Sequence, residues 1–277
     1  MKNLYSLMDF FNKKMKKNIL VILLFFAFLK VSGQTYNYKF TYSVTFQIDP
    51  ADSNKKFSEN MVLLTNNSKS LYISPVKIVL DSIRNSAIKN GGSPMDVIDF
   101  KKKLPRNRIS YSIEKKYKEN KVIYQKKIFS KYLEFEEQLN PYKWELINTS
   151  KKILGYTCKL AKTTYKGRVY EAWYAPKIPL QNGPWKFGGL PGLILKISDN
   201  KNHYSFIIKG IKKEKRKFPP YVNKSKVIKT TKENYYRTSK IIKSEFLNKF
   251  IGKSKLEMKK TFKNVGAKSK NPIELED

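Results

Sequence analysis

The stretch GPWKFGGLPGLILKISD, residues 183–199, concentrates backbone-bending residues directly before an apolar run. Four of the chain's twelve glycines and two of its twelve prolines lie in its first ten residues. Residues 190–193 have the chemistry of a type II turn, because proline fixes φ at the second position and glycine accepts positive φ at the third. A phosphate-binding loop would need glycines that open a helix, and a nucleophile elbow would need Ser or Cys at the bend. We therefore predict a structural corner, made of Gly188, Gly189, Leu190, Pro191, Gly192, Leu193 and Ile194.

The N-terminus has the pattern of a secretory signal peptide over residues 1–33. Lysines at positions 13, 14, 16 and 17 precede the apolar run 19–29, and the small residues Ser32 and Gly33 follow. Translation could start at Met1 or at Met15 with the same export signal. Eleven apolar residues are too few for a membrane-spanning helix, which needs about 20. We expect an exported protein in the periplasm, at the outer membrane or outside the cell, with no transmembrane segment after signal removal.

The expected mature chain is strongly basic. Removing residues 1–33 leaves 51 basic against 21 acidic residues, a net charge of +30. Such a surface suits polyanions, including an anionic membrane surface that it would contact peripherally. However, only six of the 57 basic residues are arginine, so a lysine-biased genome is the alternative explanation. The sequence has no long block of one charge sign, and we expect no specific nucleic-acid partner.

Cysteine and histidine counts limit the chemistry of the chain. One cysteine excludes an intramolecular disulfide, so the core must hold the fold. One histidine and one cysteine are too few for the common metal sites with three or four such ligands, and we expect neither metal nor cofactor. Residues 34–262 are expected to form a single β-rich domain. The polar residues 263–277 are expected to be a disordered tail.

Alternating apolar residues mark the expected strands. Residues 36–48 place aromatic and β-branched side chains at every second position, which indicates a half-buried strand. Ser74 and Pro75 form a helix start, and apolar residues recur at helical spacing until Gly91. Further strands are expected at residues 61–65, 71–73, 110–118, 121–129, 132–137, 142–147, 153–165, 168–174, 193–198 and 204–211.

A second amphipathic helix is expected near the end of the domain, where Thr230 and Glu233 have capping-box spacing. The short turns between strands favour an antiparallel meander. The expected fold class is therefore α+β: a β-rich domain with a long curved antiparallel sheet, one inserted helix and one or two C-terminal helices.

The corner also carries a family resemblance. The sequence GLPGLI at residues 189–194, with the flanking GYTCKLA, GRVYEAWYAPKIPLQNGPWKF and KISD, resembles the GLPGLI family of exported bacterial envelope proteins. The resemblance is strong over residues 144–210. It implies an exported, β-rich protein of a family without an established activity, cofactor or catalytic residue.

Few residues could support catalysis. His203, the only histidine, lies in a polar turn, and Cys158 lies on an apolar strand face with Leu154, Tyr156 and Leu160. A Cys158–His203 pair remains the thiol form of a hydrolase hypothesis. The carboxylates Glu134, Glu136 and Glu137 are expected to pair with lysines of neighbouring strands.

Aromatic residues around the corner provide the candidate binding region: Arg168, Trp173, Tyr174, Trp185 and Phe187. Their first interpretation is a sheet core, and the functional alternative is the rim of an apolar cleft with Arg168 facing an anionic headgroup. We predict a non-enzymatic envelope protein that binds or carries a hydrophobic, amphipathic or lipid-like ligand, or a partner protein. The alternatives are a hydrolase with an unrecognised site and a polyanion-binding protein.

Overall fold

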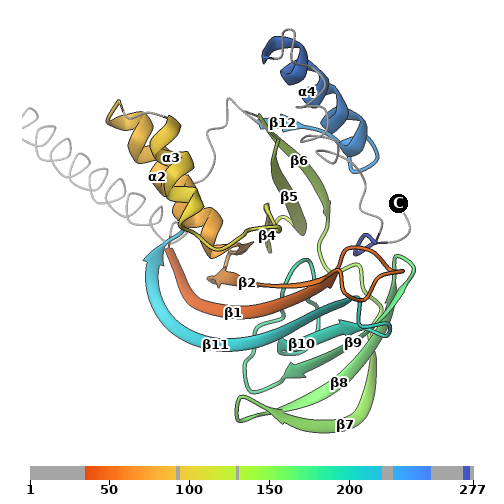
Figure 1. The fold of residues 1–277 in the computed structure, drawn as a ribbon. Helices are drawn as coiled ribbons and strands as arrows, with labels where there is room; N and C mark the ends of the chain where they lie inside the picture. Colours follow the sequence, from red (N-terminus) through yellow and green to blue (C-terminus); the bar gives the residue numbers. More distant parts are fainter. Residues whose placement is uncertain (1–34, 92–93, 129–130, 220–226, 251–270, 275–277) are drawn as a thin grey trace, which may run out of the picture. The chain divides into compact units, whose positions relative to one another are not determined.

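The computed structural model describes residues 35–91, 94–128, 131–219, 227–250 and 271–274 (Figure 1). The predicted signal peptide, residues 1–33, lies outside the described residues, as does most of the predicted tail. In chain order the strands and helices are β1 Thr35–Gln47, β2 Lys56–Thr65, β3 Lys69–Ile73, α2 Pro75–Lys89, α3 Pro94–Lys102, β4 Tyr111–Lys116, β5 Lys121–Ile128, β6 Lys131–Gln138, β7 Glu145–Ile153, β8 Tyr156–Tyr165, β9 Arg168–Ala175, β10 Leu193–Asp199, β11 Tyr204–Lys217, β12 Val227–Lys229 and α4 Tyr235–Phe250.

The twelve strands of the described residues form one sheet, in the order β12-β6-β5-β4-β3-β2-β1-β11-β10-β9-β8-β7. Successive hairpins pair antiparallel, as in β1 with β2 and β8 with β9. The short strand β12 instead runs parallel to β6, so the sheet is mixed and the prediction of a purely antiparallel sheet is wrong at this edge. β1 and β11 bend strongly along their length (Figure 1).

Tight turns in the β meander follow from local chemistry. Asn120 joins β4 to β5 with φ 51°, and the pair Lys166 and Gly167 joins β8 to β9 with φ 47° and 73°. A further turn lies inside the stretch 153–165, which was predicted as one strand: Leu154 and Gly155, with φ 49° and 79°, separate β7 from β8. Leu154 is therefore an exposed turn residue and not a member of the Cys158 strand face.

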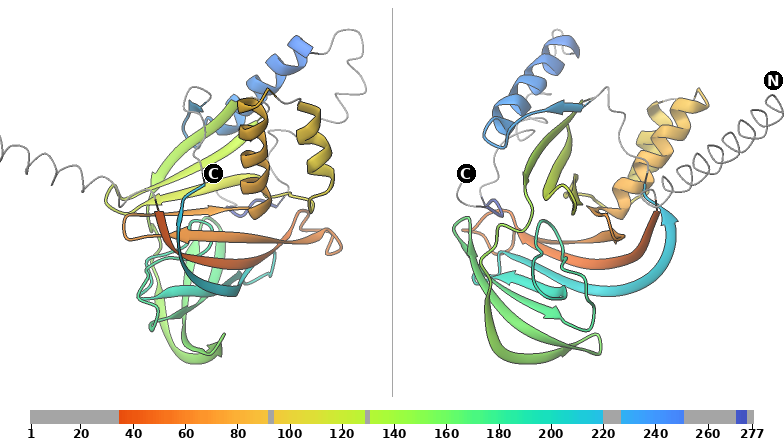
Figure 2. Two further views of the ribbon diagram at one scale, coloured as in Figure 1. Left: turned by 90° about the vertical axis from the view of Figure 1, so that its left-hand side faces the viewer. Right: turned by 180° about the vertical axis from the view of Figure 1, so that it is seen from behind.

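The helices differ in number and limits from those expected. The inserted segment holds two helices, α2 and α3, which pack beside one another, with α2 also against β2 (Figure 2). Helix α4 packs against β5 and β6 and begins at Tyr235 rather than after Thr230. The predicted capping box does not start the helix, because the backbone N–H of Thr230 bonds instead to the carbonyl of Glu134 next to the β12–β6 pairing.

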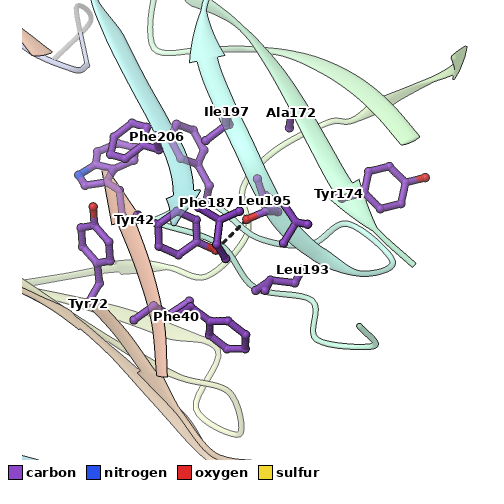
Figure 3. Packing of buried hydrophobic residues seen from close by; sticks show 14 of the residues in the cluster. Phe40, Tyr42, Tyr72, Ala172, Tyr174, Phe187, Leu193, Leu195, Ile197 and Phe206 are labelled. Atoms are coloured by element: carbon purple, nitrogen blue, oxygen red, sulfur yellow. Dashed lines mark hydrogen bonds between the residues drawn. The ribbon is translucent and has the colours of Figure 1, made fainter. Parts of the chain in front are cut away.

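The main core joins side chains from both halves of the sheet. Phe40, Tyr42 and Tyr72 from β1 and β3 pack in one buried cluster with Leu193 and Phe206 from β10 and β11 (Figure 3). The hydroxyl of Tyr42 donates to the carbonyl oxygen of Ile194 at 2.7 Å, across the same core (Figure 3).

The corner at residues 188–194 is largely buried, and only Gly189 and Pro191 are exposed. Leu190, Leu193 and Ile194 are buried in the main core. The turn differs from the predicted type II turn: the Gly192 N–H donates to the Leu190 carbonyl at 2.8 Å, and the Leu193 N–H donates to Ile178. Positive φ is still needed, since Gly192 has φ 149° and a Cβ there would overlap the carbonyl of Ala175.

Residues 271–274 contradict the predicted disordered tail. Asn271 and Glu274 are buried, and the segment hydrogen-bonds to side chains of β9 and β11. The polar composition was misleading here because the polar groups are used in specific contacts inside the domain.

Candidate functional site

Arg168, the first residue of β9, is the centre of a buried ionic cluster. Its Nη1 donates to Oδ2 of Asp199, at the end of β10, at 3.0 Å, and both side chains are almost fully buried. Asp199 also accepts a hydrogen bond at Oδ1 from the backbone N–H of Tyr204. The predicted role of Arg168, facing an anionic headgroup, is therefore wrong: its charge is compensated inside the protein.

His203 completes one side of this cluster. Its Nδ1 lies 3.4 Å from Nη1 of Arg168. A guanidinium can only donate, so Nδ1 is the acceptor in this contact. The backbone carbonyl of His203 accepts from the N–H of Gln47, which brings the end of β1 beside the cluster.

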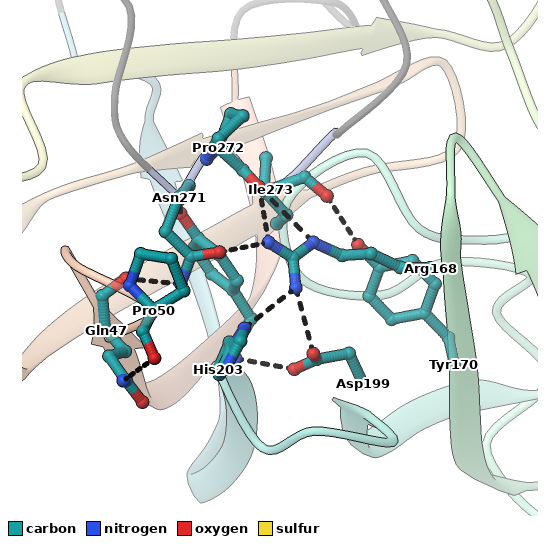
Figure 4. A network of polar contacts seen from close by, with 10 residues as sticks. Gln47, Pro50, Arg168, Tyr170, Asp199, His203, Asn271, Pro272 and Ile273 are labelled. Carbon is teal, nitrogen blue, oxygen red and sulfur yellow. Dashed lines mark hydrogen bonds and ion pairs between the residues drawn. The ribbon is translucent and has the colours of Figure 1, made fainter. Parts of the chain in front are cut away.

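The segment 271–274 covers the cluster (Figure 4). Nη2 of Arg168 donates to Oδ1 of Asn271, and both Nε and Nη2 donate to the Pro272 carbonyl at 3.2 and 2.7 Å. Nδ2 of Asn271 donates to the Gln47 carbonyl at 2.8 Å. The amide oxygen of Asn271 thus accepts from a donor, and its amide nitrogen donates to an acceptor.

Two tyrosines hold the backbone of the same segment. Tyr204 donates to the carbonyl of Asn271 at 2.6 Å, and Tyr170 donates to the carbonyl of Ile273 at 2.7 Å. Burial raises the pKa of Tyr204 to about 12 and raises that of Tyr170 further. Both phenols therefore keep the proton that they donate at physiological pH.

A second ionic cluster holds the end of the segment. Lys186 donates to Oε1 of Glu274 at 2.7 Å and also pairs with Glu137. Lys232 pairs with both carboxylates from the other side. The Lys186 ammonium also lies 4.9 Å from the ring centroid of Trp185. The carboxylate of Glu274 therefore forms ion pairs with two cations, Lys186 and Lys232.

An aromatic pocket of about 260 Å³ adjoins the segment. Pro272 and Ile273 form part of its wall, with Arg108 and Lys126. Burial lowers the pKa of Lys126 from its ordinary value. The aromatic residues of the wall come from β1, β4, β5, β11 and α4: Phe46, Tyr111, Tyr124, Tyr204, Phe206, Tyr235 and Tyr236. A smaller cavity of about 110 Å³ shares Tyr111 and Tyr124 with this pocket and is also lined by Trp185 and Lys186.

The five predicted binding residues do not form one rim. Tyr174, Trp185 and Phe187 are buried in the main core, as the core interpretation expected, and Trp185 also lines the smaller cavity. Trp173 alternates to the other face of β9, where the Lys151 ammonium lies 3.7 Å from its ring centroid.

The predicted catalytic candidates have separate partners. Cys158 is buried, its sulfur contacts the Tyr156 carbonyl, and burial raises the pKa of its thiol. His203 contacts Arg168 instead. The geometry therefore does not assemble the Cys158–His203 pair.

The carboxylates of β6 are ion-pair or hydrogen-bond partners. Glu136 pairs with Lys121 of β5 at 3.0 Å, which confirms the cross-strand pairing expected for it. Glu134 accepts from the Gln125 side chain at 3.1 Å. In the described part of the chain, no group of three His, Cys, Asp or Glu residues is placed to hold a metal ion. Nor does any described helix have the length and apolarity to cross a membrane.

A buried lysine, which the sequence analysis did not single out, fastens the corner loop to the sheet. Nζ of Lys115, on β4, donates to Oδ1 of Asn182 at 2.8 Å and to the carbonyls of Gly183 and Phe187. Burial lowers its pKa well below the ordinary value of 10.5. Nothing in the sequence distinguishes it from the neighbouring lysines, since its role depends on a loop about 70 residues away.

We expect Lys115→Met to lower the free energy of unfolding by about 2–4 kcal/mol, because buried carbonyls then lose their donor. The adjacent Lys116→Met variant, which removes an exposed ion pair with Glu119, should change it by less than about 1 kcal/mol. Below pH 10.5 the unfolded chain binds more protons at Lys115 than the folded chain does. The stability of the wild type relative to Lys115→Met should therefore rise with pH toward 10.5. Urea unfolding at several pH values measures both effects, and equal stability of the two variants would contradict the role of Lys115.

The described residues thus define a β-rich domain built on one mixed sheet, with an aromatic pocket beside a buried ionic cluster. The family model described as N-glycanase peptide, N-terminal domain, matches residues 97–238, slightly more than half of the chain. The chain belongs to this family.

Two solved structures of PNGF-II, in space groups P21 and C2, are similar to the chain at 19% and 20% identity, each with a TM-score of 0.48. The similarity covers 74% of this chain and 33% and 32% of theirs. The chain therefore spans about a third of the length of these proteins. No curated protein matches it.

Proposed function

We propose that this chain is an exported, non-enzymatic cell-envelope protein of the GLPGLI type that binds an anionic amphipathic ligand in the aromatic pocket. Its α+β character and its GLPGLI-type domain over residues 34–262 belong to the same proposal. The observation that carries it is the composition of the pocket: aromatic walls together with Arg108 and Lys126.

The pocket composition suits a ligand with an apolar part and an anionic group. Aromatic rings bury large areas at low entropic cost, and a few placed polar groups orient the ligand. The ring of Tyr124 contacts two other rings of the pocket. Its centroid lies 5.2 Å from that of Tyr111 and 5.8 Å from that of Tyr235. A volume of about 260 Å³ lies just below the range of roughly 300–1,000 Å³ typical of ligand pockets. The pocket therefore takes a small ligand or one end of a longer one.

Titration with the fluorescent anionic amphiphile 8-anilinonaphthalene-1-sulfonate tests the pocket. We expect saturable binding that is at least fivefold weaker in Tyr236→Ala, since Tyr236 lines the pocket, and also weaker in Lys126→Met, which removes a cation. Ile241→Ala, at an exposed position of the same helix, is the matched control and should bind like the wild type. Equal affinity in all four proteins would place the dye elsewhere and refute the proposal.

The family assignment supplies a second candidate, because its description refers to an N-glycanase. N-glycanase activity in this chain would release an N-linked glycan from a glycoprotein, which mass spectrometry detects. The binding proposal expects no release with the purified chain. Release that persists in Tyr236→Ala would replace the binding proposal with the enzymatic one.

A further inference from the structure

The segment 271–274 is held in the way that a binding site holds a peptide. Its polar contacts are made to side chains and one carbonyl of the sheet, rather than as a strand added to a sheet edge. Three successive carbonyls, those of Asn271, Pro272 and Ile273, each accept from a side chain of β9 or β11. Such contacts fix the backbone, which bends at Asn271 and Ile273, without depending on most of its side chains.

Two side chains of the segment are recognised individually. Oδ1 of Asn271 accepts from Arg168, whereas Nδ2 donates to the carbonyl of Gln47. An aspartate at this position would place a carboxylate oxygen against the Gln47 carbonyl. Both groups can only accept a hydrogen bond, so the site distinguishes Asn from Asp. Glu274 is placed between Lys186 and Lys232, so the site also selects an acidic residue at the fourth position.

The middle of the segment faces the aromatic residues. Pro272 and Ile273 line both the larger pocket and the smaller cavity, together with Tyr111, Tyr124 and Tyr235. Proline has a fixed φ and lacks an N–H, so at the second position it leaves no backbone donor unpaired against these rings. The second and third positions are therefore apolar.

We propose that the Arg168, Gln47 and Lys186 region is a binding site for a peptide of the form Asn-Pro-aliphatic-Glu, which residues 271–274 occupy as an intramolecular ligand. A peptide with the same four residues, from a second copy of the chain or from another protein, competes with the segment for the site. The proposal concerns the segment and its polar contacts, and it does not depend on which ligand the aromatic pocket binds.

Competition between the internal segment and an added peptide tests this site. The probe is a fluorescein-labelled peptide KSKNPIELED, which corresponds to residues 268–277. The receptors are the full wild-type chain, the variant Glu274→Lys and the double variant Asn271→Ala, Glu274→Lys. Fluorescence anisotropy should show at least tenfold tighter binding to the double variant than to the wild type, because the internal ligand no longer fills the site. The milder variant Glu274→Lys should show at least threefold tighter binding, and it keeps the test valid if the double variant does not fold.

Peptide variants supply the specificity control. In the probe, replacing the residue that corresponds to Asn271 by Asp, or the residue that corresponds to Glu274 by Lys, should weaken binding to the Glu274→Lys chain at least tenfold. Equal affinity for the original and Asp-containing peptides, or no saturable binding to a folded Glu274→Lys chain, would overturn the proposal. Sedimentation distinguishes the sources of the peptide. A wild-type dimer that the double variant lacks identifies a second copy, whereas a monomer at all concentrations together with peptide binding identifies another protein.

Discussion

Gly192→Val should lower the free energy of unfolding by about 3–5 kcal/mol. Gly192 has φ 149°, where a β-branched residue is strained by about 1–3 kcal/mol. In addition, a Cβ at this position would overlap the carbonyl of Ala175 and lie 2.9 Å from the nitrogen of Pro176. These are backbone atoms that cannot rotate away, and overpacking costs about 1–3 kcal/mol more. Thermal and urea unfolding of the purified variant measure the loss.

Gly210→Val is the matched control. Gly210 lies in β11, and a Cβ there would meet nothing within 4 Å, so the stability should change by less than about 0.5 kcal/mol. Gly188→Ala should have an intermediate effect, because its Cβ would press on the movable side chain of Asn140 as well as the carbonyl of Gln181. If Gly192→Val and Gly188→Ala both kept the wild-type melting temperature, the corner would not be structural.

Arg168→Met should destabilise the fold by about 3–5 kcal/mol. The substitution keeps most of the side-chain volume but leaves the buried carboxylate of Asp199 without its cation. It also removes both donors to the carbonyl of Pro272. Urea unfolding should show a lower midpoint than in the wild type.

An exposed ion pair between strands provides the comparison. Lys162→Met breaks the pair between Lys162 and Glu171, which has the same 3.0 Å separation on the surface, and should cost less than about 1 kcal/mol. Adding Asp199→Asn to Arg168→Met should restore part of the lost stability, because the unpaired charge is removed. Similar losses from Lys162→Met and Arg168→Met would show that burial of the pair has no effect.

Strands were predictable where the signal was local. Alternation over residues 36–48 matches β1, and Asn120 and Gly167 mark turns whose positive φ their residue types accept. The turn at Leu154 was missed because leucine rarely adopts positive φ, so the stretch 153–165 was predicted as one strand. Strand β12 has three residues and depends on pairing with β6, about 95 positions earlier, which no local pattern indicates.

The site was less predictable because its contacts connect distant residues. Arg168 was singled out as a rare arginine, but its bond to Asn271 spans 103 positions, and only the folded sheet brings the two together. Lys115 and Lys186 were indistinguishable among 51 basic residues of the expected mature chain. The Pro-Ile pair at positions 272 and 273 is one of the few apolar interruptions in this polar tail, and nothing distinguishes it locally from Val265 or Leu275.

The contacts of residues 271–274 also determine the order in which parts of the fold can form during synthesis. The ribosome makes this segment after every strand that it contacts, so β1, β9 and β11 are synthesised before the residues that cover the buried pair of Arg168 and Asp199. Until then, the buried ionic groups and the aromatic rings that line a pocket with Pro272 and Ile273 lack this cover, and transiently exposed apolar surface favours aggregation. Asn271 and Glu274 can make their contacts only after β12, the last of the described strands, has been synthesised.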